Sequence, residues 1–203
     1  MLAFAVRVPA RTSAFHATLR NWVVLAALVE ISAGILNQCG LPNMLLYNLY
    51  WPVEFGMLLA LGATVAPLPR RWTIPLMVLF LLGWTWNVSS LDPRRELVSL
   101  SVISGALMLA ALYLFLLWYG AGRWTGRLRD VSAFWLCLAI LLYYGPAGPL
   151  LGSINYFMRT DMGMALWLHQ LTQVLCVGKF LFMSMACYRL YGSTTAVAHE
   201  AGH

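Results

Sequence analysis

Six stretches of the chain are almost wholly apolar, and short segments rich in Gly, Pro, Ser or Arg separate them. The apolar core of a bilayer is about 30 Å thick, and a helix of roughly 20 residues crosses it. The pattern therefore predicts an all-α integral membrane bundle of six transmembrane helices, the first of them the shortest. The expected spans are residues 22–38, 44–66, 72–90, 97–119, 131–151 and 163–190.

Little of the chain lies outside the resulting transmembrane domain, residues 22–190. Residues 1–21 are basic and contain no acidic residue, and residues 191–203 are mostly small and polar. We expect the first segment to be a cytoplasmic lead-in or a helix along the membrane surface. The second is predicted to be a flexible cytoplasmic tail, as chain ends commonly are.

Composition supports a membrane protein. Of the 203 residues, 61% are hydrophobic and only 10% are charged, whereas soluble domains have about 25% charged residues. Too few polar side chains remain to cover a surface that faces water. Most of the surface is therefore expected to contact the lipid bilayer, and the length suits one compact bundle.

The positive charges predict the orientation of the bundle. With the N-terminus inside the cell, nine arginines fall in cytoplasmic segments and three in outer segments. Cytoplasmic loops carry an excess of Lys and Arg, so both termini are predicted to be cytoplasmic. The net charge of +6 is then explained by the arginines of the cytoplasmic segments, and no nucleic-acid partner is expected. The inner set is Arg7, Arg11, Arg20, Arg70, Arg71, Arg123, Arg127, Arg129 and Arg189; the outer set is Arg94, Arg95 and Arg159.

Three charged residues lie near the middle of predicted spans. They are Glu30, Glu54 and Lys179. Charged side chains at membrane depth are costly and almost always face the interior of the bundle. Two acids and one base do not balance, so one carboxyl group is expected to be protonated or to await a cation or proton.

The helical period assigns neighbours to Glu54. At about 100° per residue, Tyr47, Tyr50 and Trp51 fall within an arc of about 100° that includes Glu54. Glu30 shares its helix face with small residues, including Ala33 and Gly34, which favours a packing face. We predict that these residues look into the bundle.

The last span carries a polar stripe. His169, Thr172, Gln173, Cys176 and Lys179 fall within an arc of about 120°, running from the outer surface to mid-depth. The candidate ligand-binding residues are therefore Glu54, Tyr47, Tyr50, Trp51, Glu30, Lys179, His169 and Gln173.

Pro52 predicts a structural hinge in the second span. A proline inside a helix removes one hydrogen bond and frees the carbonyl one turn earlier, here that of Asn48. At membrane depth this carbonyl must be satisfied by a neighbour or by water. Pro146 and Pro149 are expected to interrupt the fifth span in the same way.

No metal site or cofactor is predicted. The final residues HEAGH match the H-E-x-x-H zinc pattern. They contain Gly202, end the chain and offer no third ligand, whereas catalytic zinc needs three protein ligands in a fixed geometry. The four cysteines are widely spaced and contain no C-x-x-C pair, so neither zinc nor a disulfide framework is indicated.

The polar residues at depth admit two interpretations. Glu30, Glu54 and Lys179 could form an ion-pair network that only holds the helices in order. Alternatively, they form an internal site, which typically combines apolar walls with a few convergent polar groups. In that case Lys179 pairs with Glu54 or Glu30 at rest, and a ligand or proton shifts the pairing.

Three function classes follow from the second interpretation. We expect a non-enzymatic sensor or ligand-binding subunit that acts through a cytoplasmic or membrane signalling partner, or as a homo-oligomer. The alternative is a small-solute, ion or proton transporter, because two oppositely oriented three-helix halves allow an inverted repeat. A lipid-acting enzyme is disfavoured, because Ser99, Ser101 and Ser104 have no evident base at fixed spacing.

The order of three segments resembles that of small multi-pass proteins of bacterial inner membranes. The segments are LYNLYWPVEF in the second span, FWLCLAILLYYG in the fifth and LHQLTQVLCVGKFLF in the last. The resemblance implies a bacterial inner-membrane location and assigns no residue a function.

Overall fold

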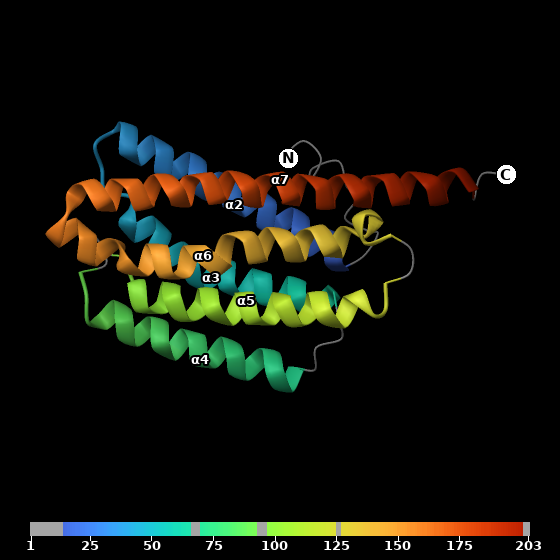
Figure 1. The fold of residues 1–203 in the computed structure, drawn as a ribbon, viewed down its shortest axis with the longest axis horizontal. Helices are drawn as coiled ribbons and strands as arrows, with labels where there is room; N and C mark the ends of the chain where they lie inside the picture. The colour runs from blue at the N-terminus through green and yellow to red at the C-terminus, as the bar shows by residue number, and fades with distance from the viewer. Residues whose placement is uncertain (1–13, 66–69, 93–96, 125–126, 201–203) are drawn as a thin grey trace.

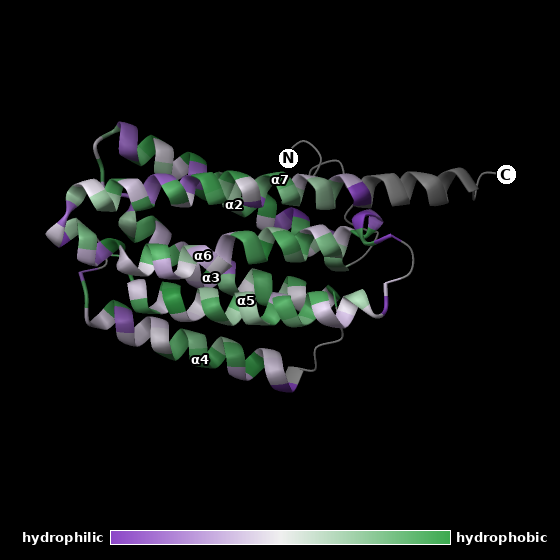
Figure 2. Ribbon diagram, viewed as in Figure 1, coloured by the Kyte–Doolittle hydropathy of each residue, from purple (hydrophilic) through white to green (hydrophobic). Residues whose placement is uncertain are grey.

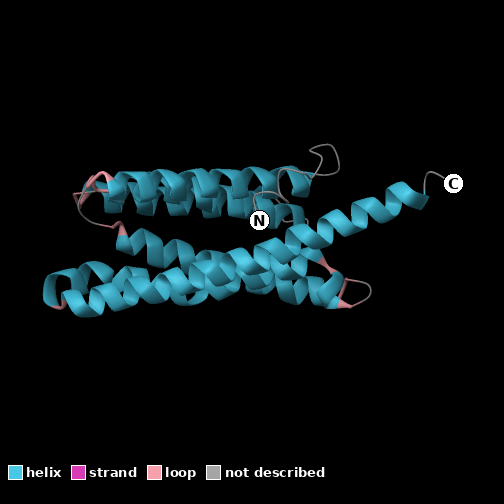
Figure 3. Cartoon of the chain, turned by 90° about the horizontal axis from the view of Figure 1, so that it is seen from above, coloured by secondary structure: helices cyan, strands magenta, loops and turns pink. Residues whose placement is uncertain are grey.

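The computed structural model describes residues 14–65, 70–92, 97–124 and 127–200, and within this part the chain is a helical bundle without strands (Figures 1 and 3). A single turn of 3₁₀ helix, η1 (Leu128–Asp130), precedes the fifth long helix. The six helices in the described residues are long and apolar enough to cross a membrane, which confirms the predicted membrane bundle. They are α2 (Ala14–Gln38), α3 (Met44–Val65), α4 (Arg70–Ser89), α5 (Ser99–Ala121), α6 (Ser132–Thr160) and α7 (Met162–Glu200).

The helices run up and down along one axis, and α2 begins and α7 ends toward the same end of the bundle, called here the end with the termini (Figure 1). Each helix packs against the next in the chain, and α3 also contacts α5. The most extensive contacts are those of α6 with α7 and with α5. At the end that carries the termini, α7 continues past the other helices (Figures 1 and 3).

Apolar residues occur along all six helices (Figure 2), and they include both buried and exposed side chains. Trp22, Leu58, Tyr113, Ile140 and Met183, from five different helices, are fully buried and form part of one core. Large apolar side chains are also exposed, and on α4 they include Trp72, Leu79, Leu82 and Trp86. Soluble monomers rarely expose apolar patches of this extent, so this outer surface suits lipid.

Small residues bring α5 and α6 close together. A side-chain carbon added at Gly148 would lie 2.9 Å from the Cβ of Ala106, and one added at Gly152 would overlap Ile103. Small residues at helix interfaces allow this close approach in membranes. The contact holds the C-terminal half of α6 against α5.

Helix α6 extends nine residues beyond the predicted end of the fifth span at residue 151. The segment GSINYFMRTD was expected to form a loop, as one of the breaks between spans that are together rich in Gly, Pro, Ser and charged residues. Asn155 instead bonds to the backbone of Leu97, accepting from its N–H at 3.2 Å and donating to its carbonyl at 2.7 Å. Ile154 is buried, so tertiary contacts stabilise the extension.

The two chain-end segments also differ from expectation. Helix α2 begins at Ala14, so the end of the predicted lead-in, residues 14–21, belongs to the first helix. Helix α7 continues to Glu200, through most of the predicted flexible tail. Lengthening an existing helix avoids the cost of nucleation. Residues 1–13 lie outside the described part, as do the side chains of the HEAGH motif.

The three prolines that were expected to disturb helices lie inside continuous ones. Pro52 lies within α3, and Pro146 and Pro149 lie within α6, so the predicted interruption of the fifth span is wrong. The carbonyl of Asn48 accepts a hydrogen bond of 3.1 Å from Nε1 of Trp84. A neighbouring helix thus satisfies the carbonyl that Pro52 frees, while hinge motion at Asn48 and Pro52 stays a prediction.

Candidate functional site

A cavity of about 360 Å³ lies between α2, α3, α6 and α7, with α5 contributing to its wall. All eight candidate ligand-binding residues line it. Its volume is within the range of small-molecule sites, about 300–1,000 Å³. The helical period therefore placed these residues around one space, while ligand binding there stays a prediction. The eight are Glu30, Tyr47, Tyr50, Trp51, Glu54, His169, Gln173 and Lys179.

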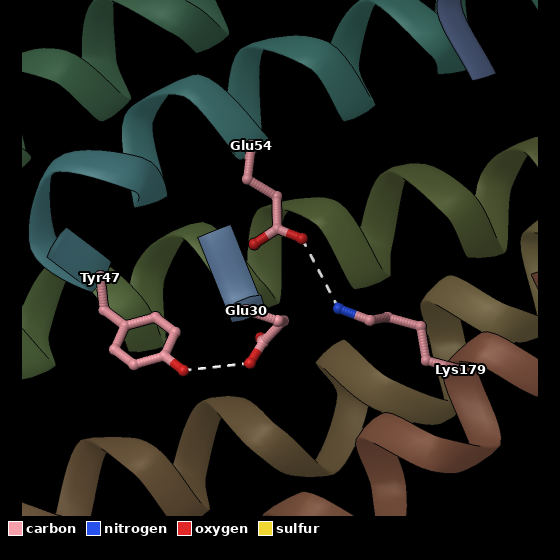
Figure 4. A network of polar contacts seen from close by, with 4 residues as sticks. All are labelled: Glu30, Tyr47, Glu54 and Lys179. Carbon is pink, nitrogen blue, oxygen red and sulfur yellow. Dashed lines mark hydrogen bonds and ion pairs between the residues drawn. The ribbon is translucent and has the colours of Figure 1, made fainter. Parts of the chain in front are cut away.

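A buried ion pair forms the inner end of the cavity. The ammonium nitrogen of Lys179 lies 3.6 Å from Oε1 of Glu54, and both side chains are more than nine-tenths buried (Figure 4). Of the two acids expected as partners of Lys179, the structure pairs it with Glu54. The distance exceeds the 2.7–2.9 Å or so of a charge-assisted hydrogen bond, which leaves the pair loosely joined.

Glu30 has a different environment from Glu54. Its carboxylate accepts a hydrogen bond of 3.1 Å from the Tyr47 hydroxyl and forms no ion pair among the described residues (Figure 4). Ala26 and Ala33 on its helix face are buried, as expected for packing, but Glu30 itself is exposed at the cavity. Helix α2 packs against α3 and leaves the cavity open beside Glu30.

Aromatic rings surround the ammonium group of Lys179. Its nitrogen lies 4.1 Å from the ring centroid of Tyr143, 5.2 Å from that of Phe180 and 5.7 Å from that of Tyr144. A cation over aromatic faces within about 6 Å is attracted by the negative face of the ring. The pocket around Lys179 is therefore built to hold an ammonium ion.

Tyr143 and Tyr144 are two site residues that were not predicted from the sequence. Both line the cavity, and the Trp51 and Tyr144 rings lie 5.7 Å apart. Adjacent residues point about 100° apart on a helix, and no charged residue marks the inward face of the fifth span. The available signal was the similarity between YNLYWP and LLYYGP, which places tyrosines at corresponding positions in two helices.

Several polar atoms around the ion pair lack partners. The hydroxyls of Tyr50 and Tyr144 are buried and form no hydrogen bond with any other described residue, and Oε1 of Glu54 has only its 3.6 Å contact with Lys179. Buried polar groups are paired in the large majority of cases, so each exception needs an explanation. All three side chains line the cavity, where an incoming group could satisfy these atoms.

The cavity is open at one end. Asn37, His169 and Gln173 line its outer part and are exposed. The Nε2 atoms of His169 and Gln173 lie 3.5 Å apart. Beyond Glu54 and Lys179, toward the end with the chain termini, Leu58 and Met183 are fully buried. These exposed lining residues therefore lie toward the end opposite the termini, while Glu30, near the middle of α2, is also exposed at the cavity.

No group of three or more potential metal ligands occurs among the described residues. The charged groups of the site are thus two carboxylates and one ammonium, surrounded by aromatic rings. Such an arrangement can bind a cation or exchange a proton. Comparison with known proteins adds no family: no family model, no curated protein and no solved structure matches the chain.

Proposed function

We propose that this chain is a non-enzymatic membrane receptor subunit that binds a small polar ligand from outside the cell. The observation that carries the proposal is the cavity that opens away from the termini and ends at the Lys179–Glu54 pair. A site that only fixed helix order would need no opening and no unpaired Tyr50 and Tyr144 hydroxyls.

Helix α7 is the proposed output element. It carries Lys179 at the inner end of the cavity and extends past the bundle at the end that holds the termini. Arg189 of α7 forms an ion pair of 3.2 Å with Asp130. A ligand that binds beside Lys179 and moves its side chain would therefore shift α7 relative to α6 and change the surface that a partner protein or second copy contacts.

The proposal includes an orientation and a location. The arginine-rich end of the bundle lies in the cytoplasm, following the excess of Lys and Arg in cytoplasmic loops. The membrane is a bacterial inner membrane. The ligand then enters from the outer side, and the signalling partner contacts the cytoplasmic end of α7.

A specific observation favours transport as the second candidate. The similar segments YNLYWP and LLYYGP come from corresponding helices, α3 and α6, of the two three-helix halves, and both reach the cavity. Transporters built from inverted repeats place their substrate at such an interface. Against this, α6 packs far more extensively on α5 and α7 than α3 does on α2 and α4.

Sided modification of Cys176 distinguishes the two functions. Cys176 lines the cavity, Cys39 is exposed, and Cys137 and Cys187 are buried. In a Cys39→Ser variant, an impermeant trimethylammonium thiosulfonate reagent would be applied to right-side-out and inside-out vesicles. A receptor exposes Cys176 to the outer face only, whereas a transporter that alternates exposes it to both.

The matched control is Cys176→Ser, which keeps Cys39 at the outer end of α2 as a marker of the outer face. Modification of Cys176 from both faces, together with solute flux in proteoliposomes that Glu54→Gln abolishes, would show that the chain is a transporter and not a receptor. If Cys176 of the folded protein is modified from neither face, both functions are contradicted.

A further inference from the structure

The charges that line the cavity do not sum to zero. Glu30 and Glu54 are carboxylates, and Lys179 is the one Lys or Arg side chain that the structure places among the cavity's lining residues. Lys179 neutralises Glu54 at 3.6 Å, while Glu30 has only the Tyr47 hydroxyl. One further positive charge would balance the site, and uncompensated charge at membrane depth is unfavourable.

We propose that the ligand binds through a primary ammonium group held between Glu30 and the tyrosines of α3 and α6; this rests on the proposed receptor function. Figure 4 shows two separate contacts, Glu54 with Lys179 of α7 and Glu30 with the Tyr47 hydroxyl, and both carboxylates line the same cavity. The ammonium of the ligand occupies this space and lies beside that of Lys179, with one carboxylate for each cation.

The aromatic walls suit a cation rather than an anion. Lys179 already lies over three rings of the cavity, at 4.1 Å from the Tyr143 ring and at 5.2 and 5.7 Å from those of Phe180 and Tyr144. Tyr47 and Tyr50 extend the same aromatic lining toward Glu30. An anionic ligand would face two carboxylates and the negative faces of these rings.

The unpaired atoms indicate a primary ammonium. The buried hydroxyl oxygens of Tyr50 and Tyr144 can accept hydrogen bonds. A primary ammonium offers three N–H donors, whereas a quaternary ammonium offers none. A quaternary cation would gain the aromatic attraction but leave the buried oxygens unsatisfied.

Two sources can supply this group: a free amine from outside the cell or the headgroup of an ethanolamine lipid. Glu30 and Gln173 are exposed at the cavity on α2 and α7. Because α2 packs mainly on α3 and α7 packs mainly on α6, a soluble amine or a lipid headgroup can approach the cavity beside these two exposed residues. The experiment therefore includes a soluble arm and a lipid arm.

The test measures protection of Cys176 in the Cys39→Ser variant, purified in nanodiscs of phosphatidylcholine and phosphatidylglycerol. Methyl methanethiosulfonate, a small neutral reagent, would modify Cys176 in the presence of butylammonium, 1-butanol or butyltrimethylammonium. We expect butylammonium at saturation to slow modification at least tenfold, and the other two probes to change it less than twofold. Equal protection by butanol or by the quaternary cation would overturn the proposal.

Two variants separate a site from a general effect of charge. Glu30→Gln removes the exposed carboxylate at the cavity and is expected to weaken butylammonium protection at least tenfold. Asp130→Asn removes one acid at the opposite end of the bundle and is expected to leave protection unchanged. Equal weakening by the two substitutions, or none in Glu30→Gln, would contradict the assignment.

The lipid arm replaces phosphatidylglycerol with phosphatidylethanolamine. Slower Cys176 modification in these nanodiscs, reversed by Glu30→Gln, would identify the lipid headgroup as the source of the ammonium. If neither butylammonium nor the ethanolamine lipid protects Cys176, the ammonium proposal fails. Outer-face modification of Cys176 would in that case still support a receptor for a different ligand.

Discussion

Replacing Lys179 with methionine leaves Glu54 buried without its cation. The two charged groups are 3.6 Å apart, which at an effective dielectric constant of about 20 corresponds to an attraction of roughly 5 kcal/mol before desolvation. Removing one partner of a buried ion pair costs about 3–5 kcal/mol, because the other charge remains buried and uncompensated. We expect Lys179→Met to lower the free energy of unfolding by about this amount.

The double substitution Lys179→Met with Glu54→Gln removes both charges together. Its loss of stability should be smaller than that of Lys179→Met alone, since no unpaired charge remains. The measurement is unfolding by sodium dodecyl sulfate in mixed micelles, followed by far-ultraviolet circular dichroism for all four members of the cycle. We expect a coupling free energy of about 2 kcal/mol or more, within the range for residues in contact.

The ion pair of Arg189 with Asp130 provides the internal control. It is partly exposed at the end of the bundle, and such pairs contribute about 0–1 kcal/mol. Asp130→Asn should therefore lower stability by less than about 1 kcal/mol. Additive effects of Lys179→Met and Glu54→Gln, with a coupling below about 0.5 kcal/mol, would refute the pairing of these two residues.

Two further predictions concern the packing that positions the cavity, and both use the same unfolding assay. Asn155→Leu removes the hydrogen bonds to the Leu97 backbone and should lower the free energy of unfolding by about 1–3 kcal/mol. In the control Ser153→Ala, the lost hydroxyl bonds only within its own helix, so stability should change little. Equal losses in the two variants would contradict the role of Asn155. Gly148→Val should lower the free energy of unfolding by about 1–3 kcal/mol through overpacking. Gly83 has open space around it, so the control Gly83→Ala should be neutral or stabilising. A Gly148→Val variant of unchanged stability would show that α5 and α6 are not closely packed.

The number of helices could be predicted from the sequence because the bilayer sets their length and composition. The end of α6 could not, because Asn155 is polar and its partner Leu97 lies 58 positions away in the sequence. A polar residue that bonds to the backbone just before a neighbouring helix looks, in sequence, like a loop residue. The same limit applies to residues 14–21, which are less apolar than the run that follows but continue its helix.

Much of the candidate site could be predicted for a related reason. Glu54 and Lys179 must face inward at membrane depth, and the helical period then assigns their neighbours to the same side. The choice between Glu30 and Glu54 as partner of Lys179 depends on how far α2 tilts from α7, which no local pattern encodes. Tyr143 and Tyr144 were missed because their helix carries no charged residue at depth to mark its inward face.

The central claim is that Glu30, Glu54 and Lys179 surround an open cavity with an excess of negative charge. The most direct measurement compares the rates at which cationic and anionic thiosulfonate reagents of similar size modify Cys176 from the outer face. Each rate is divided by that of Cys39 in the Cys176→Ser variant. A negative cavity can favour the cation by roughly tenfold or more, and this is the result we predict. Equal normalised rates, or faster modification by the anion, would contradict the account.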